Sequence, residues 1–392
     1  MSDDEKHKRY WIEVVARALN VLEALEPQDT TLTLTEVSTR LGLSRSSLFR
    51  LLYTLEKKGW IERVQGGRTF RRVSRRRSYR VGYAMLSSQF PYSIDVSRGL
   101  QEAADCHGIE LVVKDNCYSP EVALLNAEAF VREKVDFVIE CQAHERMAPV
   151  ISHLLAEAGI PSLAIDIPQP GAVFFGANNY QAGLIAGEVL GEFASARWAG
   201  QVDKLLMLEL PDAGPIPQAR IMGALNKVQD VLGPLPDSDV IHINGKGTFA
   251  DSFQVMRSVL KSIPENARIL VAAINDQSAV GAVRALEAEN RAANAAVVGH
   301  NATREARAEL RKANSCLIGS VGYFAEKYGE QIIPIVLKIL DGMAVPPAVY
   351  VEHFLISGKN VDQYYPADPS EPDFREPDAP QVAHSPFATV FS

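Results

Sequence analysis

The sequence is poor in the residues and spacings that mark disulfide frameworks and metal centres. Its four cysteines form no C-x-x-C pair and no zinc-type spacing, so we expect reduced and mostly buried thiols, as in a cytosolic protein. The eight histidines show no H-x-x-x-H spacing. The residues therefore favour neither a metal site nor a disulfide-bonded fold, and we expect no cofactor.

Long apolar runs are also missing. No stretch approaches the roughly 18 consecutive apolar residues that mark a transmembrane helix. The first residues, MSDDEKHKRYW, are charged and contain no apolar core of an export signal. We therefore expect a cytoplasmic protein without a membrane partner, which argues against a solute-binding receptor of a transport system.

No catalytic motif stands out either. The sequence has no Walker loop, no G-x-S-x-G and no clear pairing of a nucleophile with a base. The segment GKGTFA, residues 245–250, imitates the dinucleotide loop G-x-G-x-x-A, but it lies deep in the chain and outside a first βαβ unit. One such match is weak evidence for NAD. We expect no enzyme, and an enzyme on a doubly wound α/β fold is the alternative.

What the sequence does contain is a strongly basic segment near its start. Between Arg40 and Arg80 there are thirteen Lys and Arg residues and two Glu, a formal charge of +11. The whole chain of 392 residues carries −8, so the remainder carries −19. A basic segment on an acidic protein indicates a polyanionic partner for that segment alone.

Three helices are expected in the same region. Apolar residues recur at helical spacing over Trp11–Glu26. Thr33 and Glu36 form a capping-box pattern, so a second helix starts near Thr33 and stops at Gly42. A third helix is expected over Ser44–Lys57, with its first serine as the cap. Two short helices joined by a tight glycine turn form a helix-turn-helix.

A basic hairpin is expected next. WIERV and TFRRV have the composition of strands, and residues 65–68 supply a glycine turn. A helix-turn-helix followed by such a hairpin is a winged helix, and the linker RRVSRRRSYR would add phosphate contacts. The alternative is a helical packing module with a solvated charged face. We expect DNA contacts from Thr33, Ser44, Arg45, Ser46, Ser47, Phe49, Arg50, Arg68, Arg71 and Arg72.

The stretch ALNVLEALEPQDTTLTLTEVSTRLGLSRSSLFRLLYTLEKKGWIERV resembles the winged-helix domain of IclR-type transcription regulators. The resemblance covers Trp11 to Val73 and is most specific through GLSRSSLFRLLYTLEKKGWIE. It implies recognition of double-stranded operator DNA. The effector domain that is usual in that family does not follow.

The larger part of the chain reads as an α/β domain. Ten strand-like runs lie between Tyr79 and Pro366, and amphipathic helices separate most of them. This alternation is typical of parallel sheets covered on both faces, and ten strands are too many for one small sheet. We therefore expect an α/β fold in three parts: a winged helix-turn-helix with a basic linker over 1–78, a two-lobed domain over 79–366, and a disordered Pro- and acid-rich tail over 367–392.

Candidate ligand contacts lie where these strands end. Ligands of parallel α/β sheets bind outside the carboxyl ends of the strands. Aromatic rings stack on the C–H faces of a polyhydroxylated ligand, while amides and carboxylates bind its hydroxyls. Each polar residue is individually explained as a helix cap, so only the collection argues for a pocket. The residues are Phe90, Tyr92, Glu140, Gln142, Asp166, Asn178, Phe249, Asn275 and Asn301.

The same region resembles the ribose-binding periplasmic receptors and the LacI-type effector domains, through RVGYAMLSSQFPYSIDVSRGLQEAADCHGIELVVKDN, IPSLAIDIPQPGAVFFGANNYQAGLIAGEVL, ILVAAINDQSAVGAVRALEA and AAVVGHN. Ile167 stands where ribose receptors often have arginine, Asn301 where they often have aspartate, and Tyr323 where they have an amide. These departures argue against ribose and favour another sugar, a sugar alcohol or a related polar metabolite. The resemblance implies ligand contacts from Phe90, Tyr92, Asp166, Arg220, Phe249, Asn275, Asn301 and Tyr323.

Together, these patterns predict a ligand-responsive transcription regulator, and specifically a repressor. A homodimer is expected, because two-fold operator sites are the usual way in which small DNA-binding heads gain specificity. A sugar-like effector would close the two lobes and change the spacing of the two heads. The solute-binding receptor and the enzyme are the competing hypotheses.

Overall fold

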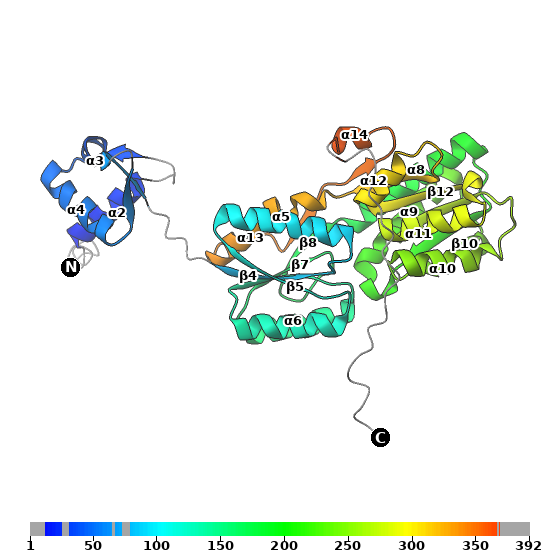
Figure 1. The fold of residues 1–392 in the computed structure, drawn as a ribbon, viewed down its shortest axis with the longest axis horizontal. Coiled ribbons are helices and arrows are strands. Elements are labelled where there is room, and N and C mark those ends of the chain that lie inside the picture. The colour runs from blue at the N-terminus through cyan, green and yellow to red at the C-terminus, as the bar shows by residue number, and fades with distance from the viewer. Residues whose placement is uncertain (1–11, 26–30, 65–66, 73–78, 367, 369–392) are drawn as a thin grey trace, which may run out of the picture. The chain divides into compact units, whose positions relative to one another are not determined.

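The computed structural model describes residues 12–25, 31–64, 67–72, 79–366 and 368 (Figure 1). Its contacts divide the chain into two compact units, Met1–Ser78 and Tyr79–Ser392, and each unit is described by itself. Residues 65–66 of the expected hairpin turn, residues 73–78 of the basic linker, and the tail apart from Asp368 lie outside the described residues.

The first unit contains three helices and a small antiparallel sheet of order β1-β3-β2. The three expected helices and both expected strands are present. β1 was not predicted, because its two residues are too few to show a strand pattern. The elements are α2 (Glu13–Ala24), β1 (Leu32–Thr33), α3 (Leu34–Leu41), α4 (Arg45–Lys57), β2 (Ile61–Val64) and β3 (Thr69–Arg72). Their inner faces bury Val21, Leu25, Val37, Leu48, Leu52 and Phe70.

The helix boundaries in this unit follow from the expected caps. Thr33 and Glu36 form the reciprocal capping box at the start of α3. Gly42 ends that helix with a left-handed φ of 65°, a conformation that glycine adopts without steric cost. The side chain of Ser44 then accepts a hydrogen bond from the amide of Ser47 and starts α4. These caps fix the tight turn between the two helices.

The first lobe of the second unit is a six-stranded, all-parallel sheet of order β14-β8-β7-β6-β4-β5. Helices cover both of its faces, with α5 and α13 on one side and α6 on the other (Figure 1). The strands are β4 (Arg80–Met85), β5 (Glu110–Asp115), β6 (Phe137–Cys141), β7 (Ser162–Ile165), β8 (Val173–Ala177) and β14 (Ala348–Val351). The helices are α5 (Pro91–His107), α6 (Pro120–Glu133), α7 (Ala148–Glu157) and α13 (Tyr328–Leu340).

The second lobe repeats this architecture with the order β10-β9-β11-β12-β13-β15, and only β15 runs antiparallel to its neighbour. α8 and α9 cover one face, and α10, α11 and α12 cover the other. The strands are β9 (Lys204–Glu209), β10 (Val240–Asn244), β11 (Ile269–Ala273), β12 (Ala295–Asn301), β13 (Leu317–Gly322) and β15 (Phe354–Ile356). The helices are α8 (Asn179–Trp198), α9 (Pro215–Leu232), α10 (Phe249–Leu260), α11 (Asp276–Ala288) and α12 (Arg304–Leu310).

The chain passes between the two lobes three times: from β8 to α8, from β13 to α13, and from β14 to β15. All ten expected strands are present and they form two lobes, as predicted. β14 and β15 were not predicted because they are short and follow a Pro-Pro pair, which does not suggest a strand. Loops at the carboxyl ends of strands from both lobes meet at a shared pocket.

α8 and α9 pack unusually closely, because glycines face backbone across their contact. A Cβ atom on Gly183 would lie 2.0 Å from the carbonyl oxygen of Arg220. A Cβ atom on Gly223 would lie 2.4 Å from the carbonyl oxygen of Tyr180. Only glycine fits at these two positions. The close contact between α8 and α9 therefore fixes the position of the Arg220 backbone.

Candidate functional site

The first unit exposes the start of α4. Arg45, Ser46, Phe49 and Arg50 are exposed, and half of the Phe49 side chain is accessible. Sequence reasoning missed Tyr53, which lies one turn after Phe49 and is 49% exposed. An exposed aromatic pair beside two arginines is a surface on which a polyanion with flat bases can dock.

Other expected DNA contacts are already bonded within the unit. The hydroxyl of Thr33 donates to Glu36 and accepts from its amide, so it serves as a cap. Ser44 and Ser47 are joined by the cap of α4. On the hairpin, Nε of Arg71 donates to Oε1 of Glu62 at 2.9 Å. Arg68 is exposed near the turn, and Arg72 is the last residue of β3.

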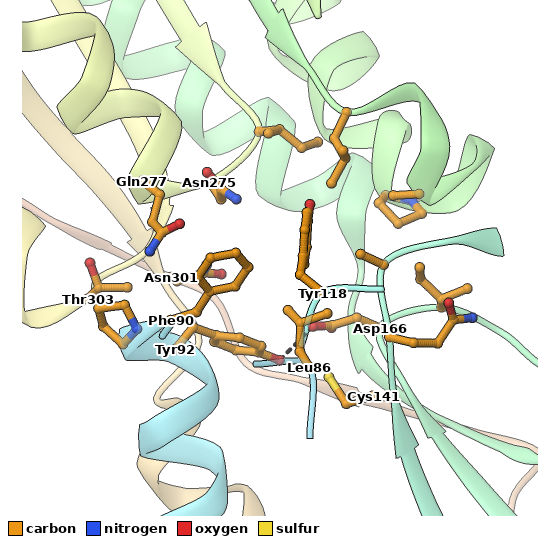
Figure 2. A pocket seen from close by; sticks show the side chains of 18 of the residues that line it. Leu86, Phe90, Tyr92, Tyr118, Cys141, Asp166, Asn275, Gln277, Asn301 and Thr303 are labelled. Carbon is orange, nitrogen blue, oxygen red and sulfur yellow. Dashed lines mark hydrogen bonds between the residues drawn. The ribbon is translucent and has the colours of Figure 1, made fainter. Parts of the chain in front are cut away.

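In the second unit, one pocket receives residues from both lobes (Figure 2). Seven of the eleven expected ligand contacts line it, namely Phe90, Tyr92, Gln142, Asp166, Arg220, Asn275 and Asn301. The further lining residues are Leu86, Pro91, Tyr118, Cys141, Ala143, Ile167, Leu210, Ala213, Pro217, Ile274, Gln277 and Thr303.

Asp166 follows β7 and adopts a left-handed φ of 63°. Its Oδ2 atom accepts a hydrogen bond from the hydroxyl of Tyr92 at 2.6 Å. Burial raises the pKa of the Asp166 carboxyl, while the positive charge of Arg220 and the bond from Tyr92 oppose that shift. The carboxylate is thus held in a fixed orientation at the wall of the pocket.

Arg220 reaches the pocket from α9. Its Nε atom donates to Oδ1 of Asn179 at 2.5 Å, and its Nη1 atom donates to the carbonyl of Ile274 at 3.0 Å. The guanidinium lies over the ring of Tyr323, 5.1 Å from its centre. Three partners therefore orient this cation, and one of them is the tyrosine that the sequence marked as a ligand contact.

A polar edge is formed by residues at the ends of β11 and β12. Asn275 caps α11 by accepting from the amide of Ser278, and its amide group donates to the carbonyl of Gly247 at 2.9 Å. Figure 2 shows Gln277 and Thr303 on the same side of the pocket. The sequence analysis predicted neither residue, although Gln277 lies two residues after Asn275 and Thr303 lies two residues after Asn301.

Two aromatic side chains, Phe90 and Tyr118, lie together in the pocket, and Tyr118 also contacts the second lobe. The rings of Phe90 and Tyr118 meet edge to face with their centres 4.8 Å apart. The hydroxyl of Tyr118, in the first lobe, donates to the carbonyl of Lys246 in the second lobe at 2.9 Å. Tyr118 was also missed, since nothing in the loop after β5 distinguishes it from a surface tyrosine.

Four expected contacts do not line the pocket. Glu140 accepts from Asn116 at 3.1 Å, and burial raises its pKa to about 8. Asn178 caps α8 with its side chain. Phe249 is 41% exposed at the start of α10. Tyr323 packs against the guanidinium of Arg220, which lines the pocket, and does not line the pocket itself.

Some arrangements are absent from the part of the chain that the structure describes. Among those residues, no group of three or more His, Cys, Asp or Glu side chains is placed to hold a metal ion. No helix within the same ranges is both long and apolar enough to cross a bilayer.

Comparisons with known proteins give two family matches. Residues 14–65 match the IclR helix-turn-helix domain, and residues 81–344 match the periplasmic binding protein domain. A comparison with curated protein sequences found no match. Both resemblances drawn from the sequence are thereby confirmed.

Solved structures show the same fold for the second unit. A solute-binding protein of an ABC transporter from Bacillus halodurans C-125, with bound myo-inositol, is 20% identical with a TM-score of 0.64, and the match covers 74% of this chain and 99% of that one. One from Actinobacillus succinogenes 130z, with bound D-allose, is 19% identical with a TM-score of 0.63, covering 73% and 100%. One from Mycobacterium smegmatis, with bound glycerol, is 18% identical with a TM-score of 0.65, covering 73% and 96%.

At these identities the structures establish the fold of the second unit. The match to the periplasmic binding protein domain also establishes the family, because residues 81–344 are well over half of the 392 residues. The chain belongs to the periplasmic binding protein domain family, and it carries an IclR helix-turn-helix domain ahead of that domain.

Proposed function

We propose that this protein is a transcription repressor that responds to a sugar, a sugar alcohol or a related polar metabolite. The observation that carries the proposal is the presence, in one chain, of an IclR helix-turn-helix domain and a periplasmic binding protein domain. The first would bind double-stranded operator DNA, and the second would bind the effector.

For the effector, the support is the chemistry of the pocket lining. Phe90 and Tyr118 offer ring faces and edges, Asp166 offers a fixed carboxylate, and the amides of Asn275 and Asn301 offer both donors and acceptors. Such a set suits a small ligand with several hydroxyls. The solved relatives with bound myo-inositol, D-allose and glycerol are consistent with that class.

For the response, the support is the two-lobed architecture with its three crossings. A ligand held between lobes favours the arrangement in which both lobes contact it, and only this differential affinity shifts the balance between arrangements. In a homodimer, the shift would alter the spacing of the two DNA-binding heads and hence the affinity for a two-fold operator.

To test DNA binding, we would titrate the full-length protein with duplexes from its own upstream region at several salt concentrations. Arg50→Ala removes an exposed cation of α4, whereas Arg63→Ala removes a cation that pairs with Glu56 at 3.0 Å. We expect Arg50→Ala to lower the affinity and to reduce the salt-dependence slope by about 0.9, the value for one phosphate contact. Equal effects of the two variants would overturn the assignment of α4 as the recognition helix.

To test the response, we would screen sugars and polyols by thermal shift and add each stabilising compound to the DNA titration. The expected result is a ligand that raises the unfolding temperature and weakens operator binding. A ligand that stabilises the protein but leaves its DNA affinity unchanged would contradict the proposed coupling.

A further inference from the structure

The polar edge of the pocket is built from two segments of the second lobe. Asn275 and Gln277 lie at the start of α11, while Asn301 and Thr303 lie where β12 ends. Figure 2 shows Asn275, Gln277 and Thr303 on the same side of the pocket. Asp276 stands between two of these residues in the sequence but is not among the lining residues. Its carboxylate therefore has its partners inside the lobe.

The Asp276 carboxylate is buried and bonded to the loop after β12. Only 1% of the residue is exposed. Its Oδ2 atom accepts from the amide of Thr303 at 2.7 Å, and its Oδ1 atom accepts from the hydroxyl of Ser320 at 2.6 Å. Ser320 lies on β13, and its Oγ atom accepts in turn from the amide of Ala302 at 2.9 Å. One carboxylate thus holds two consecutive amides, one directly and one through a serine.

This loop has an unfavourable backbone conformation. Asn301 has a φ of 106° and Ala302 has a φ of 51°, and positive φ values are costly for residues that carry a side chain. The carbonyl of Ala302 also accepts from Nη1 of Arg307 at 2.6 Å. Asn301 and Thr303, on either side of Ala302, both line the pocket. The hydrogen bonds that maintain the loop therefore also hold two pocket residues in place.

Helix capping does not account for the Asp276 carboxylate. The side chain of Asn275 already caps α11 by accepting from an amide of its first turn. Burial raises the pKa of Asp276 to about 7, although its two hydrogen bonds oppose that shift, so the ionised group is costly at this place. Gly299 leaves room for it, since a Cβ atom there would lie 2.4 Å from Oδ1. A costly buried carboxylate that is not needed as a cap indicates another role.

We propose that Asp276 is the positioning residue of the polar edge, and that it joins the two segments so that their four pocket residues meet the effector in one fixed arrangement. This inference rests on the proposed function and names a buried residue on which effector affinity depends. Groups that are already held in place lose less freedom when a ligand binds, so the network raises affinity without contacting the ligand. Ser320 is the second member of the network.

The experiment compares Asp276→Ala with Glu309→Ala in the full-length protein. Glu309, on α12, is also only 1% exposed, and its carboxylate accepts from Arg284 of α11 at 2.6 Å, outside the pocket lining. Both variants therefore remove a buried carboxylate that bonds between the same parts of the lobe. Calorimetry gives the affinity for myo-inositol, D-allose, glycerol and every sugar or polyol that stabilises the wild type, and a thermal scan gives the unfolding temperature.

We expect Asp276→Ala to lower the affinity roughly tenfold or more, as for the loss of hydrogen bonds to a charged group. Glu309→Ala should lower the unfolding temperature and keep the wild-type affinity. If the loss of affinity follows the loss of unfolding temperature alike in both variants, Asp276 serves only the fold and the inference is overturned.

Ser320→Ala is the milder variant, which decides the matter if Asp276→Ala does not fold. It leaves the amide of Ala302 without its acceptor, so the affinity should fall several-fold and this amide should exchange with deuterium roughly tenfold faster. Ser152→Ala is the control, because it removes a buried hydroxyl that bonds only within the first lobe, to the carbonyl of Ala148 at 2.8 Å. It should change neither quantity.

Hydrogen exchange also separates this inference from the proposed function, because it needs no ligand. In Asp276→Ala we expect faster exchange of the amides of Ala302 and Thr303. Wild-type exchange of both amides in Asp276→Ala and Ser320→Ala would overturn the inference, whatever compound the protein binds. If no sugar or polyol binds but the exchange rises as expected, the proposed effector class is contradicted while the positioning network is supported.

Discussion

The hydroxyl of Tyr92 donates to Oδ2 of Asp166 at 2.6 Å, so the first helix of the lobe orients a carboxylate at the end of β7. Tyr92→Phe removes this donor and leaves the carboxylate free to turn. We expect ligand affinity to fall by about tenfold, the effect of one lost charge-assisted hydrogen bond. Calorimetry with the ligand found by thermal shift measures this loss.

Tyr180→Phe is the matched control for that change. Tyr180 is 41% exposed on α8, and its hydroxyl accepts from Asn226 at 3.1 Å outside the pocket. Its variant should bind ligand as the wild type does. A similar loss in both variants would mean that Tyr92 acts on general stability and does not position Asp166.

The capping box formed by Thr33 and Glu36 should contribute to the stability of the first unit, which is called the head below. Thr33→Ala removes both hydrogen bonds of the Thr33 hydroxyl, and we expect the head to lose about 1 kcal/mol of unfolding free energy. Scanning calorimetry of the full chain measures the loss. Thr39→Ala is the control, because that hydroxyl bonds only back to the helix carbonyl of Thr35 and its loss should be nearly neutral.

The same capping box predicts how the stability of the first unit depends on pH. Hydrogen bonds from the backbone and side chain of Thr33 lower the pKa of Glu36 below its ordinary value of 4.5. The stabilisation is therefore complete above that ordinary value and is lost as the pH falls through the lowered pKa. We expect Glu36→Gln, which cannot ionise, to flatten the acid limb of the first unit's stability profile, and Thr33→Ala, which keeps the backbone donor, to flatten it only in part. An unchanged limb in Glu36→Gln would show that this carboxylate does not stabilise the first unit.

Glu140 predicts a pH dependence of the opposite sign for the second unit. Burial raises its pKa from 4.5 to about 8, so the contribution of the neutral form is complete below 4.5 and is lost as the pH rises through about 8. Glu140→Gln cannot ionise and should flatten the fall of the unfolding temperature between pH 4.5 and about 8. Glu157→Gln, at an exposed residue of α7, should keep the wild-type profile.

The glycine contact between α8 and α9 predicts a graded effect. Gly183→Ala drives a methyl group against the backbone at Arg220, so we expect a loss of 1–3 kcal/mol, roughly the cost of overpacking, together with weaker ligand binding. Gly191→Ala, on the same helix, meets only the side chain of Val231 at 2.8 Å. The nearest atom is the Cβ atom of Val231, which rotation of that side chain does not move, so this variant should lose stability too, but it lies two turns beyond Gly183 on α8 and should keep its ligand affinity.

The sequence was sufficient for the lobes, the helix caps and part of the pocket. Continuous apolar strands predicted the parallel sheets, and the residues after them gave Asp166 and Asn275 at the pocket. Both residues were found because a parallel sheet directs the carboxyl ends of its strands to one edge.

The rest depended on information that residue types do not carry. Glu140 and Cys141 are neighbours on β6, and strand alternation turns the cysteine toward the pocket and the glutamate away from it. Sequence inspection favoured the carboxylate for its chemistry and ignored this alternation. Phe249 and Tyr118 depend on how the lobes approach each other, which no local pattern encodes.

The three passages between the lobes make the order of synthesis consequential. The first lobe includes β14 and α13, which lie beyond most of the second lobe along the chain, and Tyr328, Ile332, Ile333 and Val336 of α13 belong to its core. On the ribosome, the nascent first lobe therefore lacks one sheet edge and one covering helix until nearly the whole polypeptide has emerged. No contiguous fragment that ends before residue 351 contains the complete first lobe, whereas the described helices and strands of the first unit all lie within the first 72 residues.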